Sequence, residues 1–360
     1  AMDKALYLRS RGIIPVYRPI NVLAATVNIA RRYGVDAETL LAGSSIESSD
    51  IDDPHKIITT QQELYVYRRF QELIPEPGIG LELGRSFDVC DTGKLGLASM
   101  CCDNFLEAIH LVVSYLELSS SFVQYHVWSE GDTVYSALHE LIGDHDIRQL
   151  IFDIELASLY TIASFALERK KVFKEITVAY PPPTYADRYQ RIFHCPVRFN
   201  APRHLIAMDA GLLMKPMKMA NPLVKKMLAD ECAQLSERLR DETSLADKIR
   251  HEIVLGGLPY PTLEQLARRI NLSPRTIRRR LSREATSYKD ILSDMRLKQA
   301  LGLIQSTDLS IEQIAFRLGY HDSSNFCHAF KNWFGCTPGS LRKSNQTRSI
   351  AGDVETNISA

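Results

Sequence analysis

Apolar residues recur every three or four positions in several separate stretches of the chain, and this spacing predicts amphipathic helices. The stretch 20–33, INVLAATVNIARRY, is predicted to form a helix that Gly34 ends, and Asp36 is placed to cap a second one. Helices are also predicted over 61–73 and 104–118. The glycine-rich segments GIGLELG and TGKLG, which lie between these two helices, predict turns.

Strand patterns begin after residue 120. Apolar and polar residues alternate in SFVQYHVW and TVYSALHE, and the polar turn 129–132 between them predicts a β-hairpin. A long apolar helix is predicted over 146–168. FKEITVAY then predicts a strand that the prolines at 181–183 end, because proline cannot donate a hydrogen bond to a sheet. With a helix at YADRYQRIF and extended chain at VRFN and HLIAMD, residues 1–215 are predicted to form an α+β domain.

Residues 216–257 carry two charged amphipathic helices, NPLVKKMLADECAQLSERL and SLADKIRHEIVL. We interpret them as a helical connector and a candidate dimer surface. Leu228 and Leu235 are seven residues apart, but so few heptad positions do not predict a coiled coil. At the other end of the chain, residues 346–360 predict a flexible tail.

An internal repeat lies between these two regions. TLEQLARRINL at 262–272 aligns with SIEQIAFRLGY at 310–320, at a constant offset of 48 residues. Asn271 and Gly319 fall at the same place in the two copies, and both residue types tolerate the left-handed backbone of a sharp turn. Each copy begins with a capping-box pair: Thr262 with Gln265, and Ser310 with Gln313. The repeat therefore predicts two helix-turn-helix units in an all-α domain over residues 258–345.

In the first unit, Ser273 and Pro274 are the cap and first-turn proline of a second helix, PRTIRRRLSRE. Ile277 and Leu281 lie one turn apart and are predicted to face the core, so that Arg279, at 100° per residue, points outward. Arginine is the commonest reader of guanine and also neutralises phosphate. The predicted DNA-binding residues of this helix are Arg275, Thr276, Arg278, Arg279 and Arg283.

The corresponding helix of the second unit starts near Asp322, with Phe326 and Phe330 facing inward. Its predicted DNA-binding residues are more polar and less basic: Ser323, Ser324, Asn325, His328 and Lys331. Between the two units, SYKDILSDMRLKQALGLIQ predicts one helix of about 17 residues, roughly 25 Å long. Such a helix could set the two recognition helices about 34 Å apart, one turn of DNA.

The charge distribution agrees with a nucleic-acid partner. The net charge of the chain is zero, but residues 262–343 hold 14 Lys and Arg against 7 Asp and Glu, whereas residues 1–261 hold 28 against 34. A basic C-terminal end on an acidic body is typical of a protein whose C-terminal domain meets phosphates.

The segment 314–342, IAFRLGYHDSSNFCHAFKNWFGCTPGSLR, resembles the signature of the AraC/XylS family of transcriptional regulators. The resemblance implies a domain of seven helices in which the third and sixth enter adjacent segments of the major groove of promoter DNA. It also implies structural roles for Phe330, Phe334, Gly335 and Pro338. We also expect RNA polymerase as a partner and, from the helices at 216–257, a homodimer. Action as an activator is the preferred alternative, but the sequence does not reveal whether binding activates or represses.

The N-terminal region resembles the ligand-sensing domain of the ornithine-utilisation-regulator branch of that family rather than the arabinose-type barrel. The matching stretches are LELGRSFDVCDTGKLGLA, HCPVRFNAPRHLIAMD and SLADKIRHEIVLGGLPYPTLEQLARRINLSPRTIRRRL. The resemblance implies control by a small-molecule effector, and the sequence does not identify the residues that bind it. The aromatic-rich segment 115–128 and the helix 150–165 could line an apolar pocket, but we predict that they form core.

Two other functions remain as alternatives. One is a thiol-based redox regulator that uses the adjacent Cys101 and Cys102, for which we prefer the interpretation of two small buried residues. The other is an enzyme carrying the same DNA-binding unit, but none of the seven cysteines is paired at zinc-site spacing and no catalytic arrangement stands out. We therefore expect no enzymatic activity, no cofactor and no metal site. We expect a cytoplasmic protein, because the chain shows neither a secretory signal nor a membrane segment; Asp153 and Glu155 interrupt the longest apolar stretch.

Overall fold

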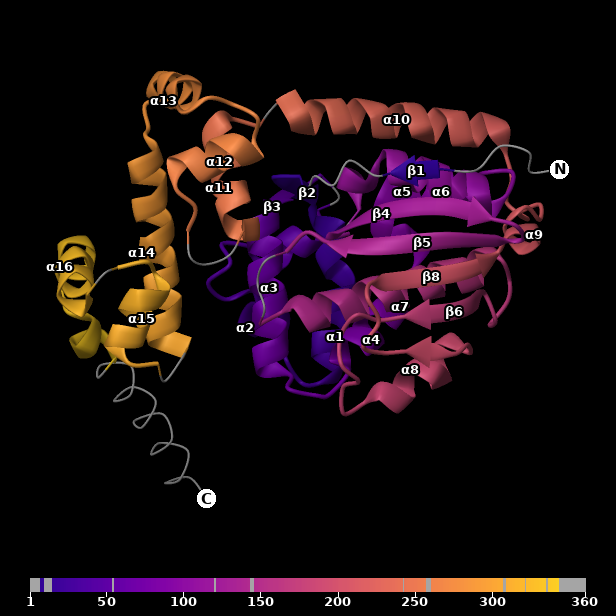
Figure 1. Ribbon diagram of the computed structural model, residues 1–360, viewed down its shortest axis with the longest axis horizontal. Coiled ribbons are helices and arrows are strands. Elements are labelled where there is room, and N and C mark those ends of the chain that lie inside the picture. Colours follow the sequence, from indigo (N-terminus) through magenta and orange to yellow (C-terminus); the bar gives the residue numbers. More distant parts are fainter. Residues whose placement is uncertain are drawn as a thin grey trace. The chain divides into compact units, whose positions relative to one another are not determined.

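The computed structural model in Figure 1 describes residues 7–9, 15–53, 55–119, 121–142, 146–241, 243–256, 260–306, 309–320, 322–334 and 336–342. The chain divides into two compact units, Ala1–Thr243 and Ser244–Ala360. The predicted tail 346–360 lies outside the described residues.

The first unit contains a six-stranded sheet of order β1-β4-β5-β8-β6-β7, open in its described part, with β1 and β7 as its edge strands. Its strands are β1 (Tyr7–Arg9), β4 (Val123–Glu130), β5 (Thr133–Glu140), β6 (Phe173–Thr177), β7 (Val197–Arg198) and β8 (His204–Asp209). The predicted hairpin is β4 and β5, which pair from Val123↔Glu140 to Glu130↔Thr133. Gly131 lies in the connecting turn with a φ of 58°, a backbone conformation that glycine adopts readily.

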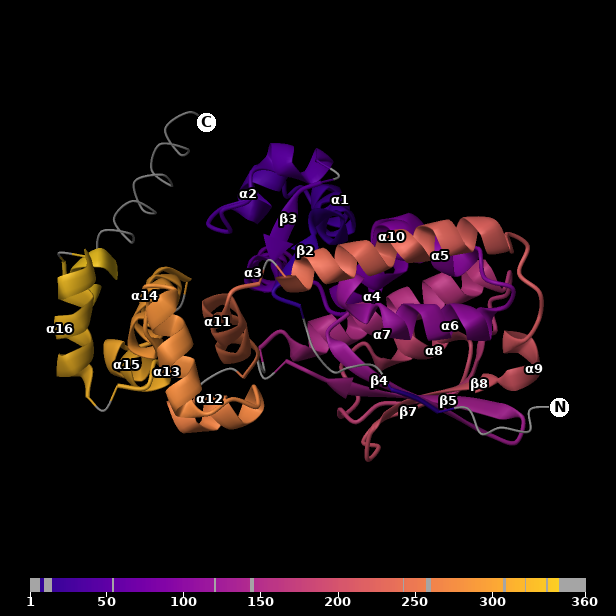
Figure 2. The ribbon, with the colours of Figure 1, turned by 90° about the horizontal axis from the view of Figure 1, so that it is seen from above.

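Helices gather on one side of this sheet, as Figure 2 shows for α6 and α7. The helices are α1 (Ala24–Arg32), α2 (Ala37–Leu41), α3 (Thr60–Leu73), α4 (Ile79–Ser86), α5 (Gly93–Met100), α6 (Phe105–Ser114), α7 (Arg148–Ala166), α8 (Ala186–Phe193), α9 (Ala210–Leu213) and α10 (Pro222–Asp241). Four 3₁₀ turns, η1 (Ile20–Leu23), η2 (Ser48–Asp52), η3 (Val89–Thr92) and η4 (Leu116–Leu118), and a small sheet of β2 (Tyr17–Pro19) and β3 (Ile57–Thr59) complete the described elements of this unit.

Helix α7 forms the core of the unit together with the sheet. Its residues Phe152 and Leu156 are buried in one apolar cluster with Val123 and Tyr125 of β4. By length and composition α7 could also cross a membrane, but most of its apolar stretch is buried inside the protein. The structure thus confirms that segments 115–128 and 150–165 contribute to the core.

The prediction of glycine-rich turns at GIGLELG and TGKLG holds only at their first glycines, Gly78 and Gly93, which have φ of 77° and 56°; it was wrong for the other glycines, which lie in α4 and α5. The reason is the packing of α4 against α7. A Cβ atom on Gly80 would lie 2.7 Å from the carbonyl oxygen of Leu150, and one on Gly84 would lie closer still to that of Ile154. These two glycines therefore let two helices approach closely instead of ending a helix.

The two helices predicted as a connector belong to different units. In α10, Cys232 and Leu239 are buried against Leu95 and Leu118 of the first unit. Helix α11 (Leu245–Gly256) lies in the second unit, where its Ile249 is buried in the first of two apolar cores. The other helices of the second unit are α12 (Leu263–Arg269), α13 (Pro274–Arg283), α14 (Tyr288–Ser306), α15 (Ile311–Arg317) and α16 (Ser323–Phe334).

Candidate nucleic-acid interface

Helices α12 and α13 form the first predicted helix-turn-helix. The hydroxyl of Thr262 accepts a hydrogen bond from the Gln265 amide at 3.2 Å, and the Gln265 side chain accepts one from the Thr262 amide at 2.8 Å. Both halves of the predicted capping box are therefore present. Asn271, in the turn, has a φ of 54°, as a sharp reversal between helices requires.

Helix α13 is capped and anchored as predicted. The Ser273 hydroxyl accepts a hydrogen bond from the Thr276 amide at 3.1 Å, and Pro274 is the first helical residue. Ile277 and Leu281 have no exposed surface and belong to the same core as Leu266. This anchoring determines which face of α13 remains in solvent.

The outward face of α13 is a row of guanidinium groups. The exposed arginines are Arg275, Arg278, Arg279, Arg280 and Arg283. Thr276, also predicted to bind DNA, is half-buried, and its hydroxyl lies 2.8 Å from that of Ser273. Arg280 was not among the predicted DNA-binding residues, although a helical wheel places it as far from the inward pair as Arg278.

The second helix-turn-helix, α15 and α16, repeats this construction. Ser310 and Gln313 form the second capping box, with distances of 3.1 and 2.8 Å, and Gly319 in the turn has a φ of 77°. Asp322 caps α16 by accepting a hydrogen bond from the Asn325 amide at 2.7 Å. Phe326 and Phe330, both without exposed surface, hold α16 in a second core.

Polar side chains rather than arginines occupy the outward face of α16. Ser324, Asn325, His328 and Lys331 are exposed, and Ser323 is half-buried. The side-chain amide of Asn325 donates to Asp322 at 2.6 Å, and the Nδ1 atom of His328 lies 3.2 Å from the side-chain nitrogen of Asn332. These contacts orient two groups that can exchange hydrogen bonds with base edges. Of the residues for which the family resemblance implies a structural role, Phe330 and Pro338 are buried, the Phe334 side chain is not described, and Gly335 lies outside the described residues.

Helix α14 joins the two halves. Its Ile291 is buried in the core of the first half and its Ile304 in the core of the second. Between them, the guanidinium carbon of Arg296 lies 5.8 Å from the ring centre of Tyr260 and 5.2 Å from that of Tyr320, within the range of cation–π interactions. Arg296 was not singled out from the sequence, because its two aromatic partners lie in different halves of the repeat.

Two other kinds of site, a metal site and a redox-active thiol pair, depend on the histidine, cysteine and acidic residues of the described part of the chain. The described histidine, cysteine and acidic residues do not gather into a group that could hold a metal ion. Cys101 and Cys102 are buried, and desolvation raises the pKa of Cys102 to about 11. Since the thiolate is the reactive form, this pair is poorly suited to sensing oxidants.

Comparison with known proteins relates both units to one family. A family model described as the arabinose-binding N-terminal domain of AraC transcription regulators matches residues 34–217, and a helix-turn-helix domain model matches residues 266–344. The ornithine utilization regulator of Pseudomonas aeruginosa is 30% identical over 90% of this chain and 96% of its own length. The transcriptional regulator VqsM of the same organism is 24% identical over 74% of this chain and 83% of its own. A crystal structure of the regulator CdpR, also from Pseudomonas aeruginosa, is 21% identical and covers 90% of this chain and 98% of that chain, with a TM-score of 0.48.

Proposed function

Because the chain belongs to the AraC family of transcriptional regulators, we propose that α13 and α16 are its two recognition helices and that they contact different base pairs of one operator. The chain is a regulator with an N-terminal ligand-binding domain and a helix-turn-helix DNA-binding domain. The observation that supports the assignment of residues is the exposed arginine row of α13, held outward by the buried Ile277 and Leu281.

The two helices have different roles in this proposal. Arg275, Arg278, Arg279 and Arg283 of α13 bind guanine edges and phosphates, with Thr276 beside them. On α16, Asn325 and His328 contact bases and Lys331 contacts phosphate. At the start of this helix, Ser323 and Ser324 contact the sugar-phosphate backbone of the DNA. One protomer then covers roughly 20 base pairs as two unlike half-sites about 10 base pairs apart.

We assign the remaining roles along the chain in the same way. Residues 1–215 sense the effector, 216–257 carry the connector and a dimer surface, and 258–345 bind DNA. The similar proteins are transcriptional regulators, so we propose that this chain has no enzymatic activity and acts on DNA in the cytoplasm. Recruitment of RNA polymerase as an activator and assembly as a homodimer complete the proposal.

The test starts from DNA ligands selected out of a random duplex pool by the full chain, followed by footprinting. We expect an asymmetric footprint, because the exposed faces of α13 and α16 differ in chemistry. The fragment 244–360, which carries both apolar cores of its unit, should bind the selected duplex without any effector. A palindromic site read by two copies of one helix, or equal binding by the fragment 1–243, would contradict the assignment.

A further inference from the structure

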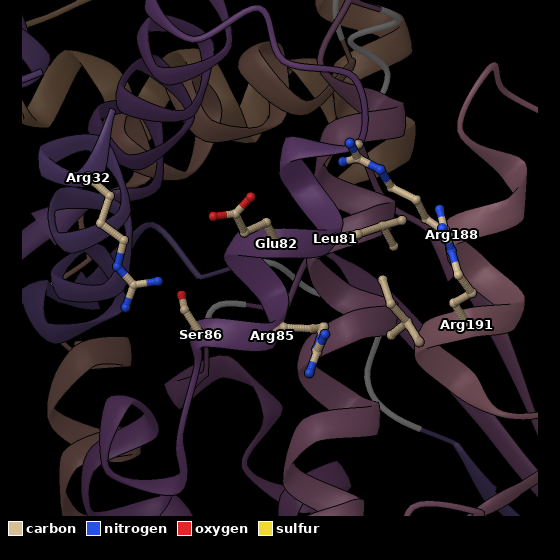
Figure 3. A pocket seen from close by; sticks show the side chains of 9 residues that line it. Arg32, Leu81, Glu82, Arg85, Ser86, Arg188 and Arg191 are labelled. Carbon is tan, nitrogen blue, oxygen red and sulfur yellow. The ribbon is translucent and has the colours of Figure 1, made fainter. Parts of the chain in front are cut away.

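A cleft of about 620 Å³ opens in the first unit between the end of α1, the last turn of α4 and helix α8. Figure 3 shows Arg32 on one side, Arg188 and Arg191 on the other, and Arg85 with Glu82 between them. Among the lining residues that the structure describes, four are arginines and Glu82 alone is acidic. A cleft of this size fits a small organic molecule.

Two of the four arginines already have acidic partners. The guanidinium of Arg188 lies 3.1 Å from Glu76 and donates to the carbonyl oxygen of Pro77 at 2.7 Å. Arg191 forms an ion pair with Asp187, one turn away on α8. Arg32 and Arg85, by contrast, have no carboxylate within ion-pair distance in the described part of the chain. The uncompensated positive charge of the cleft therefore comes from α1 and α4.

The carboxyl group of Glu82, the acidic residue among the described lining residues, is held by a neighbour. Its carboxylate accepts a hydrogen bond from the hydroxyl of Tyr33 at 2.8 Å, and this contact raises the pKa of Tyr33. The buried side chain of Leu81 and the half-buried Ile192 add apolar surface to the cleft. The lining thus combines cationic side chains with a small apolar surface.

Helix dipoles account for three of the four arginines separately, but not for the convergence of the arginines on one cleft. Arg32, Arg85 and Arg191 all lie in the last turn of their helices, where positive charge is favoured. The helix-dipole effect acts at each helix end by itself and does not require three helix ends to face one cavity. Bringing like charges together is unfavourable unless an anion lies between them.

We propose that this cleft is the effector site and that its ligand is a small organic molecule with two or more anionic groups. The proposal rests on the effector control stated above. Arg32 and Arg85 bind one anionic group, Arg188 and Arg191 bind another, and the ligand ties α1 and α8 to α4. Helix α4 packs closely on α7 through Gly80 and Gly84. A ligand that ties α1 and α8 to α4 therefore also connects α1 and α8 to the core of the unit.

Titration calorimetry of the full chain at constant ionic strength tests this site, with citrate and pyrophosphate as polyanionic probes and acetate as a monoanion. We expect at least one of the two probes to bind at millimolar concentration or below, and acetate not to bind. The double change Arg32→Gln/Arg85→Gln should weaken that binding at least about tenfold. Binding of citrate would indicate a carboxylate ligand, and binding of pyrophosphate would indicate a phosphate ligand. Failure of both probes to bind would overturn the proposal.

A matched control removes the same charge elsewhere. Arg31 and Arg169 are exposed in the first unit and do not line the cleft, so Arg31→Gln/Arg169→Gln should bind the probe as the unchanged chain does. The basic face of α13 also attracts anions, and Arg279→Ala measures its share of the signal: binding by the cleft should persist in this variant. Equal loss in the cleft variant and the control variant would refute the site. These titrations contain no DNA, so the two proposals can fail separately. A chain that binds the probe but no duplex would contradict the proposed function alone. A chain that binds the duplex but neither probe would contradict the proposed effector site alone.

Discussion

The two units of this protein treat charged side chains in opposite ways. The first unit buries several of them: Arg18, Glu63, Asp153 and Glu155 are each less than 9% exposed. In the second unit the arginines of α13 are exposed. A buried charge must find a partner inside the protein, whereas an exposed charge is free to meet a partner from outside.

The buried charges of the first unit hold distant segments together. Arg18 of β2 lies 3.3 Å from Glu63 of α3, and both side chains are fully buried. The same guanidinium donates to the carbonyl oxygen of Ser121 at 2.9 Å and lies 4.2 Å from the ring centre of Phe122. Arg18 thereby connects the small sheet and α3 to the start of β4.

The carboxylates of α7 have neutral partners. Asp153 accepts hydrogen bonds from Tyr185 at 2.7 Å and from Gln149 at 2.9 Å, and a further one from Tyr189. Glu155 accepts one from Ser121 at 2.9 Å and another from Tyr125. These contacts compensate the loss of hydration without cancelling the charge, so that the first unit depends on pH in a way that the exposed arginines do not.

The largest effect should come from breaking the buried ion pair. Arg18→Met leaves the carboxyl of Glu63 buried without its cation, and we expect the free energy of unfolding to fall by about 3–5 kcal/mol. Urea denaturation of the full chain measures this. The double change Arg18→Met/Glu63→Leu should regain most of the loss, because an apolar pair of similar volume can replace a buried ion pair. A single change that lowers the stability by less than about 1 kcal/mol would show that the pair adds little to stability.

The pH dependence should be the next largest effect. Burial raises the pKa of Asp153 from 3.8 to about 6 and that of Glu63 from 4.5 to about 7, although hydrogen bonds to Asp153 and the Arg18 cation beside Glu63 oppose it. Each carboxyl then keeps its proton to higher pH in the folded chain than in the unfolded chain. Stability should therefore fall as pH rises from about 4 to about 7, by up to about 2–3 kcal/mol for one group, and level off above that range.

Thermal unfolding between pH 4 and pH 8 tests this direction. Asp153→Asn removes one titrating group and should flatten the profile below pH 6. Glu38→Gln, a change of an exposed carboxylate on α2, should leave the profile as it is. A stability that rises with pH across this range in the unchanged chain would contradict the expectation.

For the exposed arginines of the second unit, we expect Arg279→Ala to weaken the preference for the correct base by about 1–3 kcal/mol in the half-site read by α13. If Arg279 also touches phosphate, the slope of log affinity against log salt should fall by about 0.9. Fluorescence anisotropy with the selected duplex, at several salt concentrations, measures both. Arg169→Ala on the first unit is the charge-matched control, and an equal loss in that variant would mean that α13 contributes only general charge.

The smallest expected effect concerns the second half-site. His328→Ala should relax the preference at one base pair by about 1 kcal/mol and leave the salt slope unchanged, because a hydrogen bond to a base edge displaces no counterion. Anisotropy with single-base variants of the duplex measures this preference. Phe316→Ala, at a side chain that is 81% exposed on α15, serves as the control. An unchanged preference at every position would mean that His328 does not contact DNA.

The DNA-binding unit could be predicted almost fully from the sequence because its signals are local. The capping boxes join residues three positions apart, and Ile277 and Leu281 are one helical turn apart. The glycines of α4 misled the prediction because their partner, α7, lies about 70 residues further along the chain. A glycine that ends a helix and a glycine that admits a neighbouring helix look alike until that neighbour is known.

The sequence by itself determined where α13 and α16 begin, which faces of them carry charge, and that the chain has two kinds of domain. Local hydrogen bonds and helical periodicity decide such features within a few residues. Only the tertiary structure decided that Arg18 meets Glu63 inside the protein and that four arginines, spread from Arg32 to Arg191, line one cleft. Those groups are brought together by the packing of helices and strands. The free energy of keeping each group charged depends on its burial and on its partners, and no spacing along the chain specifies either.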